Sequence, residues 1–198
     1  MSETDTEELI RVIDEAFADV TIPPDDGLLM DPSATHLEGQ KIKAAFAGRD
    51  WREIQLDTLN EHRSALAFLS AAAYAAYLPA FLKASVTDYD RVDIIPNDVI
   101  ATLTAPSELD LDRIKAEAEA SGRLQPLTDG EWAQVLDSLS AGYHEGILER
   151  VFLERAAQFD PRQKRIIRRF LEFMRDAHGA DFPDGAPQVA LARYWGRY

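Results

Sequence analysis

Histidine side chains are the first candidates for chemistry, because they bind metal ions and transfer protons. The chain has four, at His36, His62, His144 and His178. A helical zinc site places two histidines four residues apart beside an acid, and no two of these four have that spacing. Their nearest acids lie one or two positions away, so they would point in different directions from a helix. The sequence therefore predicts no metal site and no cofactor.

Motifs for phosphate binding or acyl transfer are also missing. The segment Gly142–Gly146 lacks the Gly-Lys-Ser/Thr that cradles phosphate, and the sequence has neither Gly-x-Gly-x-x-Gly nor Gly-x-Ser-x-Gly. A catalytic pair of carboxylates cannot be selected from 35 acidic residues. We therefore assign no catalytic residue, and an enzyme stays open only as an alternative.

Positive charge is concentrated in residues 161–175, where six cations and the single acid Glu172 leave a net charge of +5. At about 100° per residue these cations lie opposite Ile166, Phe170 and Phe173. One interpretation is a docking surface for an acidic partner or a phosphate-bearing ligand. The other is an exposed helix held against an acidic body by ion pairs, with Arg168 also paired to Glu172. The arginines of the predicted docking surface are Arg162, Arg165, Arg168 and Arg169.

Aromatic residues form a second candidate site. Tyr77 precedes Pro79, and Tyr194 and Trp195 lie in an aromatic cluster that also contains Tyr198. Tyrosine and tryptophan can line a ligand groove or an interface, because each combines a large apolar ring with a polar atom. The alternative is that these rings fill gaps in a helical core.

Composition limits the classes of partner. The 198 residues carry a net charge of −14, with a sequence pI near 4.6. Such acidity argues against nucleic acid or an anionic membrane as a partner, and it permits a basic protein partner. The sequence has no cysteine, no apolar stretch long enough to span a membrane and no signal-peptide pattern in its acidic first residues. These features predict a soluble cytoplasmic protein.

Helical signals extend along almost the whole chain. Ser70 is a good N-cap for a helix that begins at residue 71, and Pro79 predicts a kink or a new start near Leu78. Asp160, Pro161 and Gln163 form the strongest helix start. We therefore predict a mainly α fold, a compact multi-helix bundle with residues 1–198 as a single domain. Residues 1–30 are a candidate for a loosely packed helix and loop. Residues 91–104 are a candidate for a short strand or hairpin, and Asn97–Ile100 could alternatively start a short helix.

Motifs in two segments of the chain support a resemblance to a known family. Phe68-Leu-Ser and Tyr77-Leu-Pro-Ala-Phe-Leu follow Trp51, and the chain later contains Phe159-Asp-Pro-Arg-Gln and Ala190-Leu-Ala-Arg-Tyr-Trp. In this order they resemble a family of uncharacterised bacterial cytoplasmic proteins, a domain of unknown function. The resemblance implies no activity and carries over no catalytic residue.

The leading hypothesis is a soluble acidic protein that binds a protein partner and has no catalytic activity of its own. One alternative is an enzyme that uses carboxylates and a pocket lined by tyrosine and tryptophan to act on a small molecule. Another is a structural homo-oligomer whose subunits meet through Tyr194 and Trp195, in a self-complementary contact.

Overall fold

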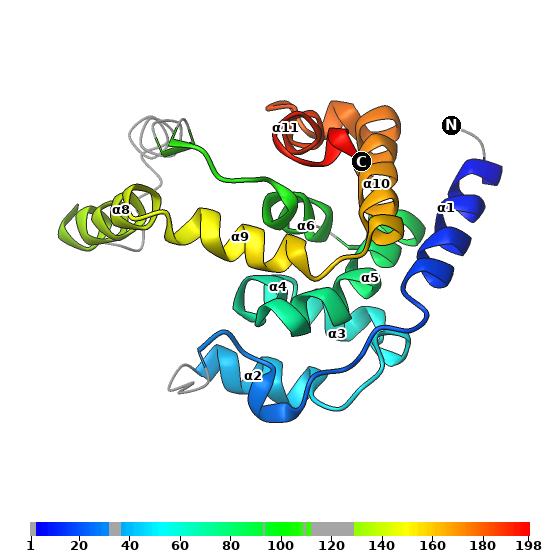
Figure 1. Cartoon of the computed structure of the whole chain (residues 1–198), viewed down its shortest axis with the longest axis horizontal. Helices are drawn as coiled ribbons and strands as arrows, with labels where there is room; N and C mark the ends of the chain where they lie inside the picture. Colours follow the sequence, from blue (N-terminus) through cyan, green and yellow to red (C-terminus); the bar gives the residue numbers. More distant parts are fainter. Residues whose placement is uncertain (1–2, 32–36, 93, 109, 112–128) are drawn as a thin grey trace. The chain divides into compact units, whose positions relative to one another are not determined.

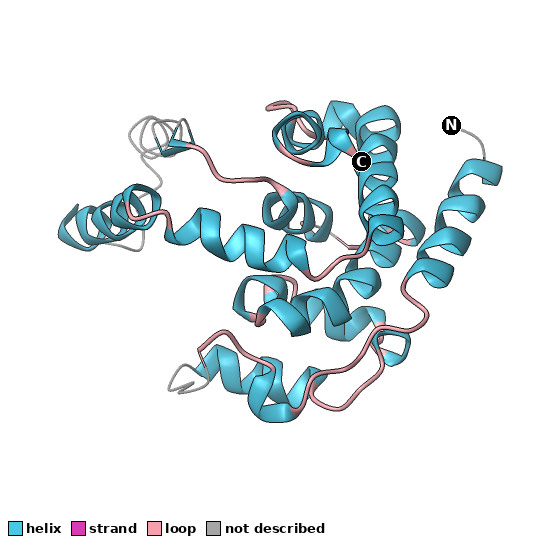
Figure 2. Cartoon of the chain, in the orientation of Figure 1, coloured by secondary structure: helices cyan, strands magenta, loops and turns pink. Residues whose placement is uncertain are grey.

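The computed structural model describes residues 3–31, 37–92, 94–108, 110–111 and 129–198, and every regular element in these ranges is a helix (Figures 1 and 2). The predicted mainly α fold class is confirmed. The chain forms two compact units, residues 1–104 with 155–198 and residues 105–154. None of the described helices is both long enough and apolar enough to cross a membrane.

The first unit contains eight α-helices among its described residues. They are α1 (Glu3–Ala16), α2 (Leu37–Phe46), α3 (Leu56–Glu61), α4 (Ala65–Phe68), α5 (Ala71–Thr87), α6 (Ile95–Leu103), α10 (Pro161–His178) and α11 (Ala186–Arg193). Short 3-10 turns connect several of them, namely η1 (Asp25–Gly27), η2 (Trp51–Glu53), η3 (Tyr89–Arg91), η4 (Gly179–Asp181) and η5 (Trp195–Arg197).

Helix α5 is the core helix of this unit and packs against α1, α4 and α6. It begins at the predicted cap, where the Ser70 hydroxyl accepts a hydrogen bond from the backbone N–H of Ala73 at 3.2 Å. Of the two outcomes predicted at Pro79, a new helix start does not occur, because α5 continues to Thr87, and the kink stays a prediction. Leu78 and Pro79 are buried with most of the helix, and this packing outweighs the backbone hydrogen bond that proline removes.

The described residues of 91–104 contain no strand, so of the two structures considered for this stretch the short helix is the one that forms. The described residues of this stretch contain the end of η3 and all of α6. Pro96 lies in the first turn of α6, where proline is favoured because that turn has no internal partner for its N–H. Ile95, Val99 and Leu103 are buried at four-residue spacing, which places them on one face of a helix.

Helix α10 has the start that the sequence predicts. Asp160 accepts a hydrogen bond from the backbone N–H of Gln163 at 2.8 Å, and the Gln163 side chain accepts one from the backbone N–H of Asp160 at 3.1 Å. One face of α10 is buried against the unit, through Ile167, Phe170, Leu171, Phe173 and Met174. The helix lies beside α1 and α11 (Figure 1).

A cluster of buried rings joins distant parts of the first unit. The ring of Phe159 lies 6.2 Å from Phe17, 6.1 Å from Tyr74 and 6.3 Å from Trp195, measured between centroids. Leu9 and Ile13 of α1 are buried as well. Helix α1, for which the sequence predicted loose packing, therefore contributes to the core of this unit.

The second unit contains α8 (Asp129–His144) and most of α9 (Ile147–Ala157), whose last three residues belong to the first unit. Gly146 separates the two helices with a φ of +65°, a left-handed conformation that glycine adopts without strain.

Candidate interaction surfaces

The basic face of α10 meets α1 through two ion pairs, which we call the α1 seam. Arg162 Nη2 lies 3.0 Å from Glu15 Oε2, and Arg169 Nη1 lies 3.6 Å from Glu8 Oε1. Arg11 of α1 also donates hydrogen bonds to both glutamates. The Arg11 guanidinium, with Arg169 nearby, lowers the pKa of Glu8. Two of the four arginines predicted for docking are thus paired with α1.

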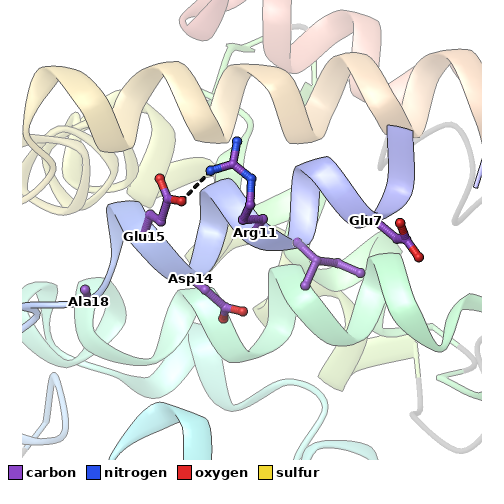
Figure 3. Close-up of a pocket in the computed structure, with 6 residues that line it drawn as sticks. Glu7, Arg11, Asp14, Glu15 and Ala18 are labelled. Carbon is purple, nitrogen blue, oxygen red and sulfur yellow. Dashed lines mark hydrogen bonds and ion pairs between the residues drawn. The ribbon is translucent and has the colours of Figure 1, made fainter. Parts of the chain in front are cut away.

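The outer face of α1 carries a shallow depression (Figure 3). The residues that line it are Glu7, Ile10, Arg11, Asp14, Glu15 and Ala18. Figure 3 shows Arg11 directed toward Glu15 on the same helix, and Asp14 pairs with Lys83 of α5 at 2.9 Å. Side chains of a single helix cannot surround a small molecule as an enclosed active site does. This depression therefore gives the enzyme alternative no support.

On the other side of α10, two cations lie against tyrosine rings. We call Lys164, Tyr194, Arg197 and Tyr198 the tyrosine shelf. The Arg197 guanidinium carbon is 3.9 Å from the ring centroid of Tyr194 and 5.3 Å from that of Tyr198. Lys164 Nζ is 5.0 Å from the centroid of Tyr198. These are cation–π distances, so the rings hold both cations in place.

In the described residues, the cations of the tyrosine shelf lie against aromatic rings and not against acids. No carboxylate oxygen in that part of the chain lies within 4.0 Å of Lys164 or Arg197. The hydroxyls of Tyr194 and Tyr198 are hydrogen-bonded at 3.3 Å. That bond, together with the nearby Arg197 and Lys164, lowers the pKa of Tyr198, whereas burial raises the pKa of Tyr194.

The remaining cations of α10 are Arg165, Arg168 and Arg175. Arg168 Nε is 2.8 Å from Glu172, and Arg175 Nε is 2.6 Å from Asp176. Arg165 is exposed and has no hydrogen-bond or ion-pair partner among the described residues. It is therefore the cation of this face that is most available to a partner molecule.

The structure separates the three aromatic residues singled out from the sequence. Tyr77 is buried, and its hydroxyl donates to the backbone oxygens of Phe46 at 2.6 Å and Arg49 at 3.1 Å. Burial raises the pKa of Tyr77 to about 12. Trp195 is also buried and donates from Nε1 to the oxygen of Leu103 at 2.6 Å. Tyr194 is partly exposed.

One histidine cluster was missed from the sequence, because its members are far apart in the chain. The rings of Tyr89 and His178 are stacked with centroids 3.5 Å apart, and Tyr89 donates a hydrogen bond to Asp181 Oδ2 at 3.0 Å. His178 Nδ1 lies 3.8 Å from the same carboxylate. Across the described ranges, no three histidine, aspartate or glutamate side chains are grouped as metal ligands.

A buried arginine was missed as well. Arg155 is 8% exposed, stacks on the ring of Tyr74 at 4.7 Å and donates to the backbone oxygens of Ala67 and Leu69 at 3.1 and 3.0 Å. Its burial lowers the pKa of the guanidinium. The sequence offers no signal for it, since Arg155 lies in a helix with several other charged residues.

Comparison with family models gives one match, over residues 5–142, to a family described as a family of unknown function, DUF6714. The matched stretch includes Trp51 and the Tyr77-Leu-Pro-Ala-Phe-Leu motif, and α10 and the tyrosine shelf lie beyond it. Comparison with curated proteins and with solved structures gives no match. The chain belongs to the family of unknown function DUF6714.

Proposed function

We propose that this protein is a non-catalytic interaction protein, and that it binds an acidic partner protein through the basic face of α10. The docking surface is centred on Arg165 and continues into Arg168. Arg162 and Arg169 border this surface, and they form ion pairs with Glu15 and Glu8 in the α1 seam. The observation that carries the proposal is the exposed Arg165, which has no partner among the described residues.

The charge distribution supports an acidic rather than a basic partner at this face. The chain as a whole has a net charge of −14, so a cluster of arginines stands out against a negative background. Such a cluster orients an acidic partner during encounter and disfavours other approach angles. Arginine suits the role because its planar guanidinium donates two parallel hydrogen bonds to one carboxylate.

The same proposal places the protein in solution in the cytoplasm. A large net negative charge favours solubility, and a chain without cysteine gains nothing from an oxidising compartment.

Affinity capture with charge-reversal variants tests this function. Tagged wild-type chain, Arg165→Glu and the control Arg150→Glu are used as baits in nuclease-treated lysate of the cells that make the protein. Arg150 is also an exposed arginine, located in the second unit. We expect a protein captured by the wild type and by Arg150→Glu, lost from Arg165→Glu and released by raised salt.

Identical sets of captured proteins for the wild type and Arg165→Glu would overturn the proposal. Recovery of only a second, untagged copy of this chain would favour the homo-oligomer alternative instead.

A further inference from the structure

We infer that the tyrosine shelf is an anion-binding subsite, in which Arg197 and Lys164 receive carboxylates of an acidic peptide segment. The inference rests on the proposed function, since it assigns the partner's chemistry at one end of the same surface. Lys164 connects the two regions, because it contacts Tyr198 of the shelf and adjoins Arg165 in α10.

Arg197 is held by the two tyrosines and still faces solvent. Its guanidinium carbon lies 3.9 Å from the Tyr194 centroid, and its side chain is hydrogen-bonded to Tyr194 and Tyr198. A guanidinium carries five N–H donors. Because Arg197 is exposed, the donors that the tyrosines do not use can reach a carboxylate while the ring contact is retained.

The backbone that carries Arg197 is held firmly. Trp195 is buried and hydrogen-bonded to the oxygen of Leu103. The next residue is Gly196, where a Cβ atom would lie 2.8 Å from the backbone oxygen of Leu191. This contact is too close for any other residue to be accommodated without a backbone shift. These contacts restrict the backbone of η5, so a ligand that binds Arg197 has less backbone entropy to remove there.

The charge balance separates this cluster from the other cations of α10. Arg162, Arg168 and Arg169 each have a glutamate within 4.0 Å. Lys164 and Arg197 have aromatic rings instead, and no carboxylate within that distance among the described residues. Rings hold a cation in place without neutralising it.

The donor set favours carboxylates over a phosphate group. Phosphate sites in proteins commonly add backbone N–H groups of a helix N-terminus or a glycine-rich loop to their cations. The tyrosine shelf consists of side-chain groups only, namely two cations and two phenols. One planar guanidinium and one ammonium match successive acidic side chains of a peptide.

Fluorescence anisotropy with defined peptides tests the subsite. The full-length chain, at about 50 mM salt where surface charges are weakly screened, is titrated into a fluorescein-labelled peptide of six glutamates. A glutamine peptide of the same length is the neutral control, and a third peptide has phosphoserine in place of one central glutamate. The variants are Arg197→Gln, Arg197→Lys and Arg165→Glu, with Arg150→Gln as the matched surface control.

We expect the wild type to bind the glutamate peptide and not the glutamine peptide. Arg197→Gln weakens binding at least tenfold, because a charge-assisted pair is lost. Arg197→Lys weakens it less, since the charge remains but the planar stacking is lost. Arg150→Gln binds like the wild type. Arg197 is exposed, so thermal unfolding of Arg197→Gln serves to confirm that the variant is folded.

The outcomes separate the subsite from the docking surface. Unchanged binding by Arg197→Gln together with lost binding by Arg165→Glu overturns the subsite and leaves the docking surface in place. Unchanged binding by both variants, or no binding of the glutamate peptide by the wild type, overturns both. Tighter binding of the phosphoserine peptide that depends on Arg197 overturns the assignment of carboxylate as the anion.

Discussion

The two sides of α10 hold their cations in different ways. Toward α1, Arg162 and Arg169 lie near Glu15 and Glu8, so each positive charge is matched by a negative one. Toward η5, Lys164 lies against the ring of Tyr198, with no carboxylate within ion-pair distance among the described residues. The arginines on the α1 side are thus paired within the fold, whereas Lys164 on the η5 side remains available to a partner molecule. This difference indicates which cations a partner can reach.

Ion pairs between exposed side chains contribute little to stability, each about 0–1 kcal/mol. The ion pairs of the α1 seam therefore contribute more to the alignment of α1 along α10 than to the free energy of unfolding of the unit. Most of the stability at α10 comes from its buried face, which supports both sides.

The largest effect is expected from Phe170→Ala. Phe170 is fully buried in the apolar face of α10, so its truncation leaves a cavity beneath both sides of the helix. We expect the free energy of unfolding to fall by about 3–5 kcal/mol, measured by urea denaturation. Phe68→Ala is the matched control, because Phe68 is 38% exposed and its loss costs much less. Equal, small losses of unfolding free energy in both variants would show that the buried face of α10 contributes little to stability.

The second largest loss of stability is expected at Arg155, a buried cation that belongs to neither side of α10. Arg155→Met retains much of the volume but leaves the backbone oxygens of Ala67 and Leu69 without this donor. We expect a loss of about 1–3 kcal/mol in the free energy of unfolding, the cost of buried unsatisfied acceptors. Arg150→Met, at an exposed position, is the control and is expected to stay within about 0.5 kcal/mol. A stabilised Arg155→Met would contradict a structural role for this guanidinium.

The smallest effect is a change in pH dependence at the C-terminal end of α10. Burial lowers the pKa of His178 from its ordinary value of 6.5, against the opposing pull of Asp181 and Asp90. Tyr89 is stacked on the imidazole, and burial raises its pKa to about 12, so it stays neutral in this pH range. The folded state thus favours neutral His178 more than the unfolded chain does.

The sign follows from proton linkage. The stability that neutral His178 contributes is fully present above pH 6.5 and is lost as the pH falls through the lowered pKa of the folded state. Urea midpoints measured between pH 5.5 and 7.5 should therefore fall more steeply toward acid in the wild type than in His178→Gln. Parallel curves for the two proteins would contradict this contribution.

Local signals in the sequence predicted two helix starts correctly. The caps at Ser70 and Asp160 depend on side chains within three residues of the helix start, so their geometry follows from the sequence alone. The continuation of α5 through Pro79 follows instead from burial, because Leu78 and Pro79 are buried with most of the helix. At residues 95–103 the sequence left both a strand and a short helix open, and a helix forms there with Ile95, Val99 and Leu103 buried.

The sequence predicted which residues form the basic face of α10, but it did not predict which acids pair with them. The basic face of α10 follows from helical spacing, yet its carboxylate partner Glu15 lies 147 residues from Arg162. Nothing in the sequence near either residue indicates this contact. The tyrosine shelf did have a local signal, because Arg197 stands between Tyr194 and Tyr198. The sequence interpretation noted the rings and overlooked the cation between them.

The most direct test of the account compares the two sides of α10 in one experiment. The double variant Arg162→Glu/Arg169→Glu and the single variant Arg165→Glu are measured both for urea stability and for capture of the partner. We expect the double variant to lose stability, because its new carboxylates face Glu15 and Glu8. Arg165→Glu keeps its stability and loses the partner. The account is contradicted if Arg165→Glu is the destabilised protein, or if it captures the partner as well as the wild type does.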